Sequence, residues 1–147
     1  MKPSNNVAEV KISYSPKCKA IIKINSAKDA ENIFRDIWEE GFSHIEYFYL
    51  LLLNRANKVL GYHLLSKGGT ASTVVDLKVL LQVVLKRNAS SIIVAHNHPS
   101  GNLKPSQQDK KLTQKIKSAC KLMDINFLDH LIMTEDDYYS FADELEL

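Results

Sequence analysis

Hydrophobic residues recur at helical spacing near the start of the chain, which predicts a helix over residues 27–40. Ser26 and Asp29 have the spacing of a capping box, in which side chains accept hydrogen bonds from backbone N–H groups of the first turn. Gly41 can end this helix. The apolar residues that would face the core are Ile33, Phe34, Ile37 and Trp38.

Two further helices are indicated by the same kind of pattern. Asp76 can cap a second helix, and Ser106 with Asp109 begins a third helix that runs to about Met123. The buried stripe of the second helix would consist of Leu77, Leu80, Leu81, Val84 and Leu85.

Five segments rich in aliphatic and aromatic residues predict β-strands around these helices. They cover residues 45–53, 59–65, 91–95, 127–133 and 138–141. Residues 54–58 are turn-like, so the first two strands should form a hairpin. Helices interspersed with strands imply a layered α/β domain.

Length and composition are those of one domain. At 147 residues and 45% hydrophobic content, the chain can bury one sizeable core. We expect a loose N-terminal tail over residues 1–14 and a single domain over residues 15–147. The formal charge of +2 is too small to indicate a nucleic-acid partner.

The cysteines and the apolar runs indicate the compartment. Cys18 and Cys120 match neither a C-x-x-C zinc site nor a secreted disulfide framework, so both are expected to be reduced thiols. Residues 1–16 lack the continuous apolar centre of a signal peptide. The longest apolar run, Tyr47–Leu53, is shorter than the roughly 20 residues that cross a bilayer. We therefore expect a soluble, cytoplasmic protein with no membrane partner; its oligomeric state stays open.

The segment His96-Asn97-His98-Pro99 carries the candidate chemistry. Two histidines at i and i+2 in extended backbone point the same way, with Cα atoms roughly 6–7 Å apart, so both imidazoles can reach one ion. Pro99 biases His98 toward extended backbone, while Gly101 and Pro105 favour a tight connection that holds the ligands in place.

Asp109 is the candidate third ligand. If Ser106 is the N-cap, Asp109 occupies the third helical position, where the helix dipole favours its ionised form. Two imidazoles and one carboxylate leave the fourth position of a tetrahedral Zn²⁺ site open for water, which is typical of a catalytic site.

Hydrolysis at such a site also needs a general base and a donor to the oxyanion. Glu46 is the candidate base because it begins an apolar strand, where partial burial would raise its pKa into a useful range. Ser106 is the candidate oxyanion donor, since one helix start would place it beside Asp109.

These residues together resemble the signature of the JAMM (JAB/MPN) metalloproteases: His-x-His-Pro, six residues, Ser, two residues, Asp. More narrowly, residues 95–101, Pro105 and Leu128-Asp129-His130 are similar to the JAB domain of RadC-like proteins. Glu46-Tyr47-Phe48 occupies the place of the Glu-x-Phe that supplies the catalytic glutamate in that family.

The resemblance covers residues 45–147 well and the first helix more weakly. It implies a three-layer α/β fold, with a mixed sheet flanked by helices and an outline like that of cytidine deaminases. It also implies Zn²⁺ as the cofactor, and a peptide or protein substrate whose peptide or isopeptide bond is cleaved by zinc-bound water that Glu46 activates. Longer RadC proteins carry an N-terminal helix-hairpin-helix region that could engage DNA; we expect none here, because this chain has no room for it.

Three other functions stay open. A zinc nucleobase deaminase would need His-x-Glu and Pro-Cys-x-x-Cys, which neither cysteine provides. A non-haem iron oxygenase can use the same two histidines and carboxylate. A RadC-like DNA-associated or scaffold protein without peptidase activity, linked to DNA repair, could bind nucleic acid through the third-helix lysines, which are Lys110, Lys111, Lys115, Lys117 and Lys121.

The remaining charged residues have simpler interpretations. The third-helix lysines are more often the solvated side of a helix than a nucleic-acid surface. His44, His63 and His130 lack metal-like spacing and are expected at the surface or in the core. Asp129 and His130 could also support the metal ligands through hydrogen bonds.

Overall fold

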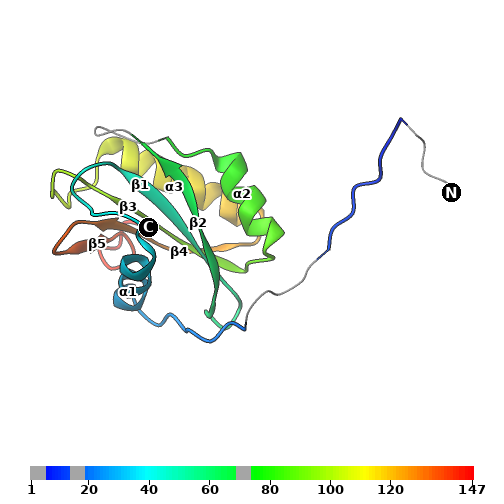
Figure 1. The fold of residues 1–147 in the computed structure, drawn as a ribbon, viewed down its shortest axis with the longest axis horizontal. Helices are drawn as coiled ribbons and strands as arrows, with labels where there is room; N and C mark the ends of the chain where they lie inside the picture. Colours follow the sequence, from blue (N-terminus) through cyan, green and yellow to red (C-terminus); the bar gives the residue numbers. More distant parts are fainter. Residues whose placement is uncertain (1–5, 14–18, 69–73) are drawn as a thin grey trace.

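A computed structural model describes residues 6–13, 19–68 and 74–147 and shows a five-stranded mixed sheet with helices on both faces (Figure 1). The spatial strand order is β2-β1-β3-β4-β5. The strands are β1 (Tyr47–Leu53), β2 (Val59–Lys67), β3 (Ser91–Asn97), β4 (Asn126–Met133) and β5 (Tyr138–Ser140). The helices are α1 (Ala27–Ile37), α2 (Leu77–Lys86) and α3 (Gln107–Leu122). The predicted layered α/β class is confirmed.

The two faces of the sheet have separate cores, and β1 contributes to both. All seven residues of β1 are buried, because β1 lies inside the sheet and both of its faces are covered. Its odd-numbered residues pack with Phe34 and Trp38 on the α1 side. Its even-numbered residues pack with Leu80 of α2 and Ile116 of α3. Each large side chain buried in this way contributes about 1.5–3 kcal/mol to folding.

The first helix is shorter than expected. Ser26 caps α1 as predicted, but α1 ends at Ile37 rather than at residue 40. Trp38 leaves the helix with ψ of 122°, and its backbone N–H donates to Phe34 O at 3.0 Å. Its ring packs beside Tyr49 at a centroid distance of 4.6 Å. This burial of the indole under the sheet turns the chain before Gly41 is reached.

Other predicted boundaries differ by one or two residues. β2 continues two residues beyond 65, β3 continues through His96 to Asn97, and β4 begins at Asn126. The β1–β2 pair is the predicted antiparallel hairpin. Ser106 caps α3 as expected.

The topology brings three segments of the chain together at one end of the inner strands. β3 and β4 are parallel, and α3 connects them, so the carboxyl end of β3 lies near the start of α3. β1 is antiparallel to β3, with Phe48 opposite His96. The beginning of β1 therefore meets the end of β3 and the first turn of α3.

Some of the sequence predictions fall on residues outside the described part. Cys18 and the expected boundary at residue 14 are among them. Cys120 is buried with a free thiol, and burial raises its pKa to about 11. None of the helices in the described part of the chain combines the length and apolar character needed to span a bilayer.

Candidate metal centre

His96 and His98 lie at the carboxyl end of β3. His96 is the penultimate residue of the strand and is 1% exposed, whereas the side chain of His98 is 16% exposed. Alternate side chains of an extended segment point to the same side. The two imidazoles accordingly lie together, with their Nε2 atoms 3.0 Å apart.

Asp109 reaches both histidines from the first turn of α3. The carboxylate oxygens of Asp109 lie 3.2 Å from His96 Nε2 and 3.0 Å from His98 Nε2. Ser106 Oγ accepts a hydrogen bond from Asp109 N at 3.0 Å, and Asp109 Oδ2 accepts one from Ser106 N at 2.9 Å. This capping box fixes the carboxylate. Ligating atoms of the three side chains all lie within 4.8 Å of one another, so the group could hold a metal ion.

A tight turn orients the ring of His98. Gly101 N–H donates to His98 O at 3.0 Å, and Gly101 has φ of 82°, a conformation that residues with side chains disfavour. The turn places Asn102 O 2.6 Å from His98 Nδ1. Because a carbonyl oxygen only accepts, His98 Nδ1 carries a hydrogen and Nε2 is the atom turned to Asp109.

His130 lies behind His96 and extends the group into the core. His130 Nε2 lies 2.8 Å from His96 Nδ1, and His130 Nδ1 lies 2.7 Å from Thr113 Oγ1. Thr113 also bonds to Asp109 O at 2.7 Å. His130 is fully buried and stacks on Phe141, and this burial lowers its pKa well below the ordinary value.

The electrostatics of the centre favour an ionised Asp109 carboxylate. Burial opposes the charge of Asp109, but the close approach of the His96 and His98 rings and the hydrogen bond from the backbone of Ser106 outweigh this effect, and they hold the pKa of Asp109 well below its usual range. Burial also opposes protonation of His98. Hydrogen bonds to Asp109 and to the Asn102 carbonyl outweigh that effect and raise the pKa of His98.

Glu46 faces the same group from the segment before β1. Its Oε1 lies 4.0 Å from His96 Nε2, and its side chain is 12% exposed. Burial raises the pKa of Glu46, and His96 and His98 partly oppose that rise. The expectation that Glu46 begins the strand is wrong, because β1 starts at Tyr47. Residue 45 lies in a bend and residue 46 in irregular backbone, so the first two residues of the expected strand are not strand.

Asn97, between the two histidines, holds the segment that carries Glu46. It is fully buried, and its Oδ1 accepts a hydrogen bond from Tyr47 N at 2.7 Å. Its Nδ2 donates to Phe42 O and Ile45 O, each at 2.9 Å. All the polar atoms of this amide side chain are thus bonded to residues 42–47. One tripeptide therefore supplies two ligand candidates and fixes the approach of Glu46.

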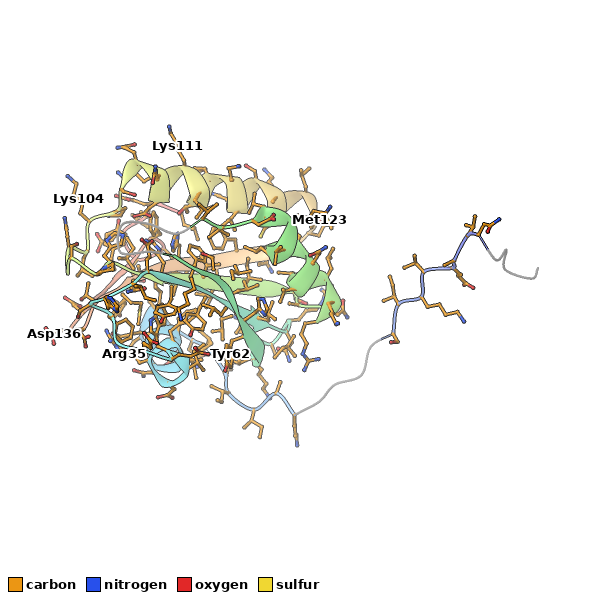
Figure 2. All side chains as sticks on the ribbon, turned by 45° about the horizontal axis from the view of Figure 1, so that its top comes forward. Arg35, Tyr62, Lys104, Lys111, Met123 and Asp136 are labelled. Atoms are coloured by element: carbon orange, nitrogen blue, oxygen red, sulfur yellow. The ribbon has the colours of Figure 1, made fainter. Side chains whose placement is uncertain are left out.

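An open cavity of about 450 Å³ adjoins the centre at His98. It lies between the loop after β3, which contributes Pro99 and Gly101, and the β4–β5 loop, which contributes Thr134 and Glu135. Lys104 and Asp136 mark these two loops at the same end of the molecule in Figure 2. Of the three candidate ligands, His98 lines this cavity, so the centre adjoins a space open to solvent at that side chain.

His44, His63 and the third-helix lysines lie on the surface and are not among the candidate ligands. His44 and His63 are exposed, as expected of surface residues. The five lysines of α3 are also exposed, and Lys111 projects outward from the helix in Figure 2. The contacts of Asn97 and Thr113 with this group were not predicted from the sequence. The spacing of Thr113, four residues after Asp109 in one helix, could have indicated a contact between them.

Similarity to known proteins extends over most of the chain. Residues 24–147 match the family described as RadC-like JAB domain. A UPF0758 protein of Flavobacterium johnsoniae is 50% identical over 122 residues, which are 83% of this chain and 52% of that protein. A UPF0758 protein of Porphyromonas gingivalis is 43% identical over 100 residues, covering 67% of this chain and 44% of that protein. A UPF0758 protein of Thermosynechococcus vestitus is 44% identical over 98 residues, covering 67% of this chain and 39% of that protein.

The chain spans about half the length of the curated relatives it matches. The matched region includes the sheet, the three helices and the candidate metal centre. The family match agrees with the resemblance that the histidine, serine and aspartate spacing indicated. The chain belongs to the RadC-like JAB domain family.

Proposed function

We propose that this centre binds Zn²⁺ and that the chain is a hydrolase that cleaves peptide or isopeptide bonds. The observation that carries the proposal is the convergence of acceptor atoms. His98 Nε2 and Asp109 Oδ2 are 3.0 Å apart, and His96 Nε2 lies 3.0 Å from His98 Nε2. When both Nε2 atoms are bare, these nitrogens and the carboxylate repel one another at such distances unless a cation, either a proton or a metal ion, lies between them.

The donor set fits zinc in chemistry and size. Zn²⁺ binds imidazole nitrogen and carboxylate oxygen at about 2.0–2.2 Å, usually in a tetrahedron. The edge of a tetrahedron with such bonds is roughly 3.3–3.6 Å. The Asp109 carboxylate lies 3.2 and 3.0 Å from the two histidine nitrogens, so a small expansion would admit the ion. Three protein ligands leave one position for water or substrate.

Two other residues would supply the remaining groups that hydrolysis requires. When bound, Zn²⁺ would polarise the substrate carbonyl and acidify water. Glu46, with its raised pKa, would take the proton from the attacking water and pass it to the leaving amine. Ser106 Oγ accepts from Asp109 N, which leaves its own hydrogen to donate to a developing oxyanion.

The test compares the Glu46→Gln variant with the parental protein and with Glu39→Gln, which changes an exposed carboxylate on the surface. Each zinc-loaded protein is incubated with a proteome-derived peptide library and with isopeptide-linked conjugates, and products are identified by mass spectrometry. The parental protein and Glu39→Gln should cleave these substrates, whereas Glu46→Gln should keep zinc and lose turnover.

Cleavage by Glu46→Gln at the parental rate would disprove the assignment of Glu46 as the base. No cleavage by any zinc-loaded protein would contradict the hydrolase assignment.

A further inference from the structure

We infer that Thr113 and His130 are positioning residues that hold His96 in the tautomer whose Nε2 lone pair faces the metal position. This inference rests on the proposed metal site and adds two residues to it. The carrying observation is a continuous set of contacts, here called the Thr113–His130 bridge. It runs from Asp109 O through Thr113 Oγ1 and His130 to His96 Nδ1.

The Thr113 hydroxyl determines which groups in the bridge donate hydrogen bonds and which accept them. Its hydroxyl has one hydrogen and lies 2.7 Å from both Asp109 O and His130 Nδ1. Asp109 O is a carbonyl oxygen and can only accept, so an approach this close requires the Thr113 hydrogen to point to it. A bond from threonine to the carbonyl four residues earlier is common in helices. Thr113 Oγ1 is then left as an acceptor for His130.

The same reasoning sets the tautomers of both histidines. His130 must donate from Nδ1 to Thr113, and a neutral imidazole with a hydrogen on Nδ1 has a bare Nε2. His130 Nε2, at 2.8 Å, must therefore accept from His96 Nδ1. With its hydrogen on Nδ1, His96 presents a bare Nε2 to Asp109 and His98. Asn102 O likewise accepts from His98 Nδ1, so the neutral His98 ring also has a bare Nε2.

Packing keeps the bridge in place. His130 is fully buried, and its ring lies 4.7 Å from the Phe141 ring at an interplanar angle of 12°. Thr113 is 1% exposed on the inner side of α3. The His96 ring stacks on Phe48 at 5.7 Å. Because these groups are shielded from solvent, water cannot easily replace the hydrogen bonds of the bridge. The bridge also ties ligand candidates from β3 and α3 to each other.

The first test reads the tautomer directly in metal-free protein. Histidine side-chain ¹H–¹⁵N correlation spectra should show the hydrogen of His96 on Nδ1 in the parental protein. Thr113→Ser, which keeps the hydroxyl, should give the same pattern. Thr113→Val should shift His96 toward the Nε2–H form, because His130 loses its acceptor. Parental His96 with its hydrogen on Nε2, or an unchanged tautomer in Thr113→Val, would overturn the inference.

The second test measures zinc affinity by competition with a chelator. Thr113→Val and His130→Phe should weaken Zn²⁺ binding by about 10- to 100-fold, the usual effect of losing a partner that orients a ligand. Thr113→Ser should restore parental affinity. Ile116→Val, one turn along the same buried side of α3, controls for general loss of packing and should leave affinity unchanged.

The outcomes separate this inference from the proposed function. If the parental protein and Thr113→Val bind Zn²⁺ with equal affinity, the inference is overturned but the proposed metal site stands. Failure of the parental protein to bind Zn²⁺ would contradict the proposed function, and the metal-free spectra would still decide the tautomer.

Discussion

Asn97 Oδ1 accepts a hydrogen bond of 2.7 Å from the backbone N–H of Tyr47, the first residue of β1. This contact joins the tripeptide that carries both histidines to the segment that carries Glu46. Its burial makes it costly to remove, because a buried amide without a partner loses its solvation and gains nothing.

Replacing Asn97 by Ala should therefore destabilise the protein and displace Glu46. The free energy of unfolding should fall by about 1–3 kcal/mol for the orphaned amide, measured by urea denaturation. Amide hydrogen exchange at Tyr47 should accelerate, and turnover should fall more than zinc affinity, because the ligands themselves remain. Asn126→Ala, on an exposed residue of β4, is the control. Unchanged exchange at Tyr47 would show that Asn97 does not hold this segment.

Zinc affinity should increase with pH through the raised pKa of His98. The protonated imidazole cannot bind metal, so protons compete with Zn²⁺ at and somewhat above the ordinary histidine pKa of about 6.5. Below the raised pKa of His98, the zinc affinity should fall about tenfold for each unit by which the pH is lowered. Asp109 adds no competition in this range, since its depressed pKa keeps it ionised. Calorimetric titration between pH 5.5 and 8 would check this; an affinity independent of pH would refute it.

Much of the fold could be predicted because local pattern and tertiary role agree. The uninterrupted apolar run of β1 reflects a strand covered on both faces, and Ser106 with Asp109 forms the cap that the spacing predicted. The convergence of His96, His98 and Asp109 was also predictable, since a strand end and a helix start meet in a β-α-β unit. Their roles as ligands stay predictions.

The supporting contacts could not be predicted, because they join segments far apart in the chain. His130 is 34 residues from His96, and Asn97 bonds to residues 50 to 55 positions earlier. The end of α1 depended on how Trp38 packs, which helical periodicity does not reveal. Glu46 was chosen as the base from its place at the start of an apolar segment and was supported by the family resemblance, but that segment was expected to be strand from residue 45, whereas β1 begins at Tyr47.

Asp129 should be a major contributor to stability near the C-terminus. Its carboxylate accepts hydrogen bonds from His130 N, Ala142 N and Ser140 Oγ, so it fastens the end of the chain to β4. Asp129→Ala would orphan these donors, each at a cost of about 1–3 kcal/mol where water cannot reach it. Asp143→Ala removes an exposed carboxylate nearby and should change little. Equal urea midpoints for the two variants would contradict this role of Asp129.

Cys120 should resist alkylation in the folded protein. The residue is 1% exposed, and burial raises the pKa of its thiol to about 11, so almost none is thiolate at pH 8. Iodoacetamide labelling followed by peptide mapping should find Cys120 unmodified in native buffer and rapidly modified in guanidinium chloride. If Cys120 were labelled as fast in native buffer as in guanidinium chloride, the α3 side of the core would have to open readily.

The most direct test of the account is anomalous diffraction at the zinc and iron absorption edges, on crystals of protein purified without added metal and then supplied with one equivalent of Zn²⁺. We expect one strong peak at the zinc edge, from an ion bonded at about 2.0–2.2 Å to His96 Nε2, His98 Nε2 and an Asp109 oxygen. The Glu46 carboxylate should face the fourth position. A peak at the iron edge alone, or His96 and Asp109 turned apart with no ion between them, would contradict it.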